Sequence, residues 1–79
     1  MTVRLLRFSD VEVLTGRPRS TLERDIADGI FPPGVKLGQR AVAWPEYEVD
    51  QINRAVIAGK SPDELRELVR HIVSKRRTA

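Results

Sequence analysis

The segment from Gly29 to Pro33 constrains the fold of this chain most strongly, because no helix can run across it. Pro32 and Pro33 lack the backbone N–H group that a helix needs, and a proline ring clashes with the preceding helical turn. Before Gly29 the apolar residues have the spacing of short helices, whereas the residues after Pro33 are typical of short strands. The sequence therefore predicts helices first and an extended hairpin second.

Residues 3–7 are expected to form a short strand or an extended segment, and the first helix is expected over residues 10–15. Ser9 occupies the N-cap position of this helix, and Glu12, three residues later, completes a capping box. Phe8 precedes the cap and is placed to pack against Val13 as a hydrophobic staple.

A second helix is expected between Arg19 and Gly29, after a short link that starts at Gly16. Leu22 and Ile26 are four residues apart, so they share one face of this helix and can pack on a core. The residues left facing outward are Arg19, Ser20, Thr21 and Arg24. The amides and the positive dipole end at the start of a helix favour a phosphate. Two helices joined by a short glycine-containing turn form a helix-turn-helix arrangement.

Residues 35–44 predict two short strands around a tight turn at Gly38 and Gln39, with glycine first, as a type II′ turn prefers. This hairpin has the size of a wing, and we call it the wing. Its tip groups Lys36, Gln39 and Arg40. Because an isolated hairpin is unstable, contacts to the helices are expected from Val35, Leu37, Val42 and Trp44.

Pro45 begins a third helix, which ends at Gly59. Its apolar face consists of Val49, Ile52 and Val56. A fourth helix has Ser61 as its N-cap, and a proline and two acids follow in the first turn. Residues 75–79 after it are expected to be a frayed tail of solvated charges.

The fourth helix carries an apolar stripe at the spacing of one helical face. The stripe consists of Leu65, Leu68, Val69, Ile72 and Val73. Two interpretations are equally open: the stripe packs on the first and third helices, or it is a surface through which two copies form a homodimer or a partner docks.

Composition excludes several classes of protein. The chain has 79 residues and no cysteine, which excludes disulfides, thiolate catalysis and cysteine-based zinc sites. His71 is the single histidine, and no acids near it in sequence could complete a catalytic or metal site. We therefore expect a protein that is not an enzyme and that holds no metal or cofactor. No apolar run approaches the roughly 20 residues that span a bilayer, so the expected location is the cytoplasm.

The net charge of +3 is unevenly distributed. Residues 1–40 carry seven basic and five acidic side chains, residues 41–59 one and three, and residues 60–79 six and three. Positive potential is thus divided between the front of the chain and its tail, with an acidic segment between them.

Several segments together resemble the AlpA family of phage and prophage transcriptional regulators. They are Leu14-Thr15-Gly16, Arg19-Ser20-Thr21-Leu22, Gly29-x-Phe31-Pro32 and Val35-Lys36-Leu37-Gly38-x-Arg40-Ala41-Val42-Ala43-Trp44-Pro45-Glu46, with Val49 beyond. The resemblance covers about Arg4 to Ile57 in order and spacing. It departs from the family at Arg17-Pro18, where an apolar residue and a serine N-cap are more usual, and at Glu23, which replaces a frequent aromatic residue.

The resemblance implies a mainly α fold with a small β-hairpin. This is a winged helix-turn-helix DNA-binding domain over residues 1–59, similar to MerR-type regulators and excisionases. The additional C-terminal helix and basic tail over residues 60–79 lie beyond the matched segments, so the resemblance implies no role for them. It implies that Arg19, Ser20 and Thr21 enter the major groove, and that the wing contacts the backbone or minor groove through Lys36 and Arg40. The full candidate DNA-binding set is Arg17, Arg19, Ser20, Thr21, Arg24, Lys36, Gln39 and Arg40.

A purely structural interpretation of the same charges also exists. Arg19 and Glu23 are four residues apart, as are Arg24 and Asp28, so both arginines could form surface ion pairs instead of contacting DNA.

The leading functional hypothesis is a sequence-specific transcriptional regulator of prophage or mobile-element genes, with double-stranded DNA as its partner and the bacterial nucleoid as its location. A neighbouring alternative is an excisionase-like recombination directionality factor, which would also contact an integrase. A third is a protein-interaction adaptor that uses the fourth helix and binds no DNA.

Overall fold

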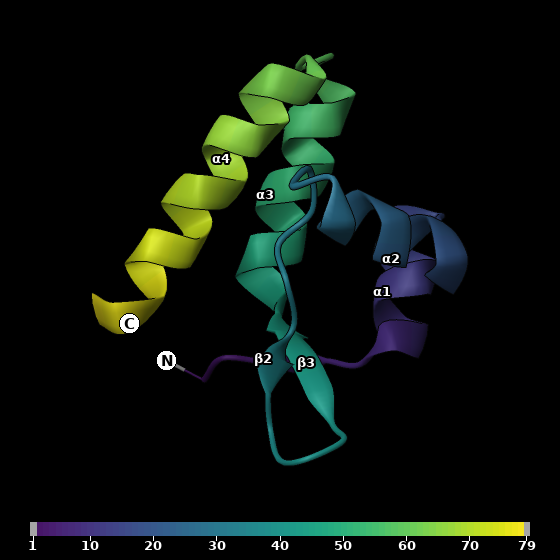
Figure 1. The fold of residues 1–79 in the computed structure, drawn as a ribbon, viewed down its shortest axis with the longest axis vertical. Helices are drawn as coiled ribbons and strands as arrows, with labels where there is room; N and C mark the ends of the chain where they lie inside the picture. Colours follow the sequence, from purple (N-terminus) through teal and green to yellow (C-terminus); the bar gives the residue numbers. More distant parts are fainter. Residues whose placement is uncertain (1, 79) are drawn as a thin grey trace.

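A computed structural model describes residues 2–78, which form four α-helices around a small three-stranded antiparallel sheet (Figure 1). The elements in chain order are β1 (Leu5–Leu6), α1 (Phe8–Thr15), α2 (Arg19–Ala27), β2 (Val35–Lys36), β3 (Val42–Pro45), α3 (Glu46–Ile57), α4 (Pro62–Lys75) and the 3-10 helix η1 (Arg76–Thr78). The predicted mainly helical fold with a hairpin is confirmed, and the arrangement is that of a winged helix-turn-helix. The loop of the wing projects away from the helices (Figure 1).

Trp44 on the central strand β3 lies at the middle of the core. It is fully buried, and β3 pairs Trp44 with Leu6 of β1. The indole N–H donates a 2.8 Å hydrogen bond to the carbonyl of Pro32. The rings of Phe8 and Phe31 meet the indole edge-on, with centroid distances of 4.7 Å and 6.2 Å. One side chain therefore joins β1, α1 and the loop before the wing.

The turn of the wing differs from the sequence prediction. Lys36 pairs with Val42, and the N–H of Leu37 donates to the carbonyl of Ala41 at 2.8 Å, so the turn has three residues and begins at Gly38. Gly38 does not adopt the positive φ that a type II′ turn requires. Leu37, expected to contact the helices, is 48% exposed.

Crowding by Val42 and Trp44 around Gly34 favours this register. Continuing the pairing places Gly34 opposite Trp44, and a Cβ at Gly34 would lie 2.9 Å from the Cβ of Val42 and 3.2 Å from the indole. A residue without a side chain is needed at this position. A two-residue turn would instead place Pro33 opposite the indole.

Helix α1 begins earlier than predicted. Its N-cap is Arg7, whose backbone N–H donates to the carboxylate of Asp10 at 3.0 Å, so Ser9 lies inside the helix. The predicted cap at Ser9 is therefore wrong. The predicted staple is also wrong, because Val13 is 83% exposed and Phe8 packs on Trp44 instead. The pairing of Leu6 with Trp44 ends the extended segment, and the contact of Phe8 with the indole starts the helix immediately afterwards.

Helices α3 and α4 pack side by side, with α4 on the outside (Figure 1). Val49 and Ile52 of α3 are buried as predicted, but Val56 is 43% exposed and Ala55 takes the inward position instead. In the α4 stripe the buried residues are Leu65, Val69 and Ile72, while Leu68 is half-buried and Val73 is 38% exposed. Most of the stripe therefore belongs to the core.

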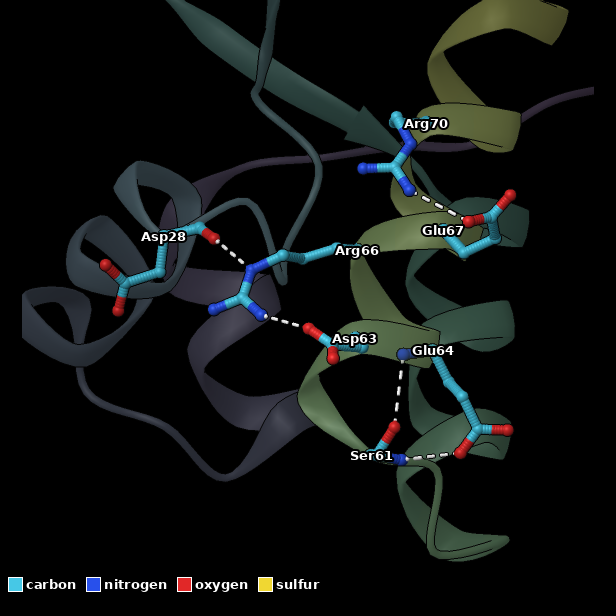
Figure 2. Close-up of polar contacts among 7 residues, drawn as sticks. All are labelled: Asp28, Ser61, Asp63, Glu64, Arg66, Glu67 and Arg70. Carbon is cyan, nitrogen blue, oxygen red and sulfur yellow. Dashed lines mark hydrogen bonds and ion pairs between the residues drawn. The ribbon is translucent and has the colours of Figure 1, made fainter.

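The first turn of α4 confirms the predicted capping box (Figure 2). The backbone N–H of Ser61 donates to Glu64 at 2.9 Å, and the N–H of Glu64 donates to the Ser61 hydroxyl at 3.2 Å. The pKa of the Glu64 carboxyl group is lowered first by the hydrogen bond from the backbone N–H of Ser61 and next by the Ser61 hydroxyl. Because the pKa of Glu64 is lower in the folded state, its ionised carboxylate stabilises the fold at neutral pH. This stabilisation is lost as the pH falls through the folded-state pKa.

Arg66 connects α4 to the end of α2 (Figure 2). Its Nε donates to the carbonyl of Asp28 at 3.0 Å, and its Nη1 donates to Asp63 at 2.9 Å. Asp28 is the C-cap of α2, and Gly29 after it has φ +78°, a conformation that favours glycine. The end of α2 is thus fixed by its own sequence and by α4.

Arg76 forms a buried connection that the sequence did not predict. Its guanidinium donates two hydrogen bonds to Glu48, at 3.0 Å and 2.7 Å, and a third to the carbonyl of Pro33 at 2.7 Å. The Glu48 side chain is 1% exposed and that of Arg76 is 21% exposed. The predicted frayed tail is therefore wrong at Arg76, while residue 79 lies outside the described residues.

Replacing Arg76 with alanine should strongly destabilise the fold, because the buried Glu48 carboxylate loses its partner. Breaking a buried ion pair on one side costs about 3–5 kcal/mol. Urea denaturation should show this loss for Arg76→Ala, whereas the control Arg77→Ala, an exposed neighbour, should stay within about 0.5 kcal/mol of wild type.

A double variant, Glu48→Met with Arg76→Met, separates the unpaired charge from lost packing. It should recover most of the stability, because apolar replacement of both members of a buried pair is often neutral. A stability of Arg76→Ala equal to that of Arg77→Ala would contradict the structural role of the pair.

Candidate nucleic-acid interface

The turn between α1 and α2 positions the second helix of the helix-turn-helix. Pro18 is the N-cap of α2 and has no side-chain oxygen to accept a hydrogen bond. The carboxylate of Glu12 accepts the N–H of Arg19 at 2.9 Å instead. The predicted capping box of Glu12 with Ser9 at the start of α1 is therefore wrong. This residue of α1 caps α2 and fixes the two helices relative to each other.

Arg19, the first residue of α2, is held by an aromatic pair. Its guanidinium carbon lies 4.1 Å from the centroid of the Phe8 ring, and Phe8 contacts Trp44. Stacking on an aromatic face leaves the N–H groups at the edge of the guanidinium plane available for an acceptor. The core thus sets the position of an exposed arginine.

Arg17 has a different environment from the other candidate residues. Its Nη1 lies 3.0 Å from Asp25, and the side chains of Arg17 and Asp25 are only 20% and 12% exposed. The guanidinium also lies 6.0 Å from the centroid of the Phe31 ring. Arg17 therefore joins the start of α2 to the core. Asp25 was missed because a lone acid in a helix gives no sign of its partner.

The remaining candidates are accessible. Thr21 is half-buried, and the exposed candidates are Arg19, Ser20, Arg24, Lys36, Gln39 and Arg40. Within residues 2–78, neither Arg19 with Glu23 nor Arg24 with Asp28 forms an ion pair, and Lys36 and Arg40 have no acidic partner. The structure thus leaves these positive charges uncompensated.

A depression of about 330 Å³ lies where α1, α2 and the wing meet. Its lining includes Arg7, Phe8, Ser9, Glu12, Arg19 and Arg40. Arg19 and Arg40 are 21 positions apart in the sequence but line the same surface. Arg7 was not among the sequence candidates, because it precedes the segment whose pattern indicates DNA contact. Lys36, Gln39 and Arg24 do not line this depression.

The structure was also searched for metal and membrane sites. In the described part of the chain, no group of three or more His, Cys, Asp or Glu side chains could hold a metal ion. No helix among residues 2–78 is long and apolar enough to cross a bilayer.

Comparison with known proteins places these elements in a family. The family described as prophage CP4-57 regulatory protein (AlpA) matches residues 4–55, which contain α1, α2, the wing and most of α3. The uncharacterized protein ORF88 of Enterobacteria phage P4 is 44% identical over 57 residues, or 72% of this chain and 65% of that relative. The match thus spans slightly less than two thirds of the phage protein. No solved structure matches the chain significantly.

Replacing Glu12 with alanine should weaken the start of α2, because the N–H of Arg19 loses its acceptor. Loss of a helix cap costs about 0.5–2 kcal/mol. Urea denaturation should show this decrease, and amide hydrogen exchange should speed up at Arg19. The control is Glu23→Ala, an exposed acid of α2, which should change stability by less than about 0.5 kcal/mol. Equal stability of the two variants would argue against the capping role.

Proposed function

Because this chain belongs to the AlpA family of prophage regulatory proteins, we propose that it binds double-stranded DNA and regulates transcription of prophage or mobile-element genes. One observation carries the proposal: the start of α2 and the tip of the wing bring Arg19 and Arg40 to one surface. Neither arginine has an acidic partner within residues 2–78. Such a surface is suited to a polyanion.

In this proposal α2 enters the major groove with its N-terminal end. Ser20 and Arg24 are four residues apart and exposed, so they point outward from the same face of α2. We assign base-edge contacts to this face, with Thr21 beside it and Arg19 turned toward the wing. An arginine pairs with two acceptors of guanine and discriminates among bases.

The wing contacts the sugar-phosphate backbone or the adjacent minor groove through Lys36, Gln39 and Arg40. Contacts of this kind position a protein on the duplex and carry no direct sequence information. Arg17 is left out of the contact set, because its guanidinium is paired with Asp25 and mostly buried.

The burial of the α4 stripe argues against an adaptor that docks through it. Leu65, Val69 and Ile72 already pack inside the chain, and only Leu68 and Val73 keep part of their surface. A homodimer through the whole stripe would require α4 to leave the core. If two copies pair on DNA, they would do so through other residues.

The same surface would serve an excisionase-like factor, so the location of the binding sites distinguishes the two roles. Fragments of the parent genome should be selected with the intact chain and sequenced. Enrichment of promoter fragments supports transcriptional regulation, whereas enrichment of attachment sites supports a recombination role with an integrase as partner. Absence of salt-sensitive binding at micromolar protein would refute DNA binding altogether.

Two substitutions should separate base reading from backbone contact. Arg24→Ala should reduce the preference for a selected duplex over a random one by about 1–3 kcal/mol. Lys36→Ala should weaken binding to both duplexes equally and lower the slope of log K against log salt by about 0.9. Fluorescence anisotropy at several salt concentrations measures both quantities.

Arg70→Ala is the matched control, because Arg70 is an exposed arginine of α4 that pairs with Glu67. It should leave both the preference and the salt slope near wild-type values. If Arg24→Ala weakened selected and random duplexes equally, its assignment as a base contact would be wrong.

A further inference from the structure

We propose that Arg7, together with Arg19 and Arg40, binds one phosphate of the DNA strand that passes between α2 and the wing. The inference rests on the proposed function and adds Arg7, which the sequence pattern and the family resemblance do not assign to DNA binding. Its basis is the depression at the junction of three elements.

The three arginines come from separate parts of the fold. Arg7 is the N-cap of α1, Arg19 is the first residue of α2, and Arg40 ends the turn of the wing. All three line the same depression of about 330 Å³. Three arginines from separate elements thus line one depression that is large enough to admit a phosphate group.

The depression keeps an excess of positive charge, because three arginines and one acid among the described residues line it. None of the three guanidinium groups has an acidic partner among residues 2–78. Glu12 is the acid that lines the depression, and its carboxylate is engaged by the backbone N–H of Arg19. Like charges gathered around one space repel one another, so an anion that enters relieves an unfavourable interaction. Phosphate fits best, because the planar N–H groups of arginine match its oxygens.

One of the three donors is already in place before DNA arrives. Arg19 is stacked on Phe8, and Phe8 is fixed by Trp44. Less side-chain entropy is lost when a preorganised donor binds its acceptor. The start of α2 adds the positive end of a helix dipole next to Arg19.

When a winged helix-turn-helix domain binds DNA, a phosphate of the DNA backbone lies between its recognition helix and its wing. A helix in the major groove and a wing in the neighbouring minor groove lie on either side of one sugar-phosphate strand. That strand must cross the surface between α2 and the wing. The depression is at this crossing, so Arg7 extends the contact to the start of α1.

Arg7→Ala tests the proposal, with Arg4→Ala as a matched control. Arg4 is an exposed arginine three positions earlier that pairs with Glu46 at 3.5 Å. Arg7→Ala should weaken binding to the selected and the random duplex by the same factor, about tenfold for a lost charge-assisted contact. It should also lower the salt slope by at most about 0.9, because Arg19 and Arg40 still contact the same phosphate. Arg4→Ala should stay within about twofold of wild type, as expected for an exposed residue outside the contact.

Two further variants separate folding from contact. The backbone N–H of Arg7 caps α1 through Asp10, and this bond does not involve the Arg7 side chain. Arg7→Ala should therefore keep the helical circular dichroism of wild type. Arg7→Lys retains the charge, so it should restore the salt slope while recovering only part of the affinity.

The phosphate itself is located by neutral methylphosphonate linkages placed one at a time along each strand of the selected duplex. One linkage should weaken binding of wild type more than binding of either Arg7→Ala or Arg40→Ala, because each variant has already lost one of the three contacts to that phosphate. Inorganic phosphate at matched ionic strength tests the other source of the anion. Competition by inorganic phosphate that is lost in Arg7→Ala supports the same site.

The outcomes distinguish this inference from the proposed function. If the chain binds no duplex, both are wrong. If wild type binds DNA but Arg7→Ala behaves as Arg4→Ala does, the phosphate site is wrong and the proposed function stands. If inorganic phosphate binds at Arg7 while Arg7→Ala leaves DNA binding unchanged, the site does not serve DNA.

Discussion

The buried indole of Trp44 is the contact on which the rest of the structure depends. Its N–H holds the carbonyl of Pro32, and its ring meets Phe8 on one side and Phe31 on the other. Each of these rings in turn lies beside an arginine at the start of α2: Phe8 beside Arg19 and Phe31 beside Arg17. The helix proposed to read DNA and the strand that forms the wing are therefore both positioned by contacts with one side chain, which together with Val42 also crowds Gly34 in the hairpin.

Helix α4 provides a second constraint on the same elements, although it lies outside the residues that match the family. Arg66 bonds the carbonyl at the end of α2, and Arg76 bonds the carbonyl of Pro33 just before the wing. The buried carboxylate of Glu48 would be costly without a partner, so its pairing with Arg76 ties the end of α4 firmly to the start of α3. The C-terminal helix thus helps to hold α2 and the wing, which form the proposed DNA surface, in place.

Features encoded by neighbouring residues could be predicted from the sequence, whereas those that depend on distant partners could not. The capping box of Ser61 with Glu64 and the helix end at Gly29 involve residues within a few positions, and both are confirmed. The N-cap of α1 and the turn of the wing are set by contacts with Trp44, so local patterns gave the wrong answer. The phosphate and base contacts of the candidate set remain predictions, and within it the partner of Arg17 was invisible because Asp25 has no distinguishing local pattern.

The distribution of ion pairs explains how a chain of net charge +3 leaves several cations near α2 and the wing without an acidic partner. Away from α2 and the wing, Arg54, Arg66 and Arg70 pair with acids on their own helices. Around the start of α2 and the wing, Arg7, Arg19, Arg24, Lys36 and Arg40 have no acidic partner within residues 2–78. The acids of α3 and α4 thus compensate arginines of their own helices, whereas the cations near α2 and the wing keep unpaired charges. Repulsion there opposes folding slightly but favours any polyanion that approaches, because binding removes the repulsion as well as adding contacts.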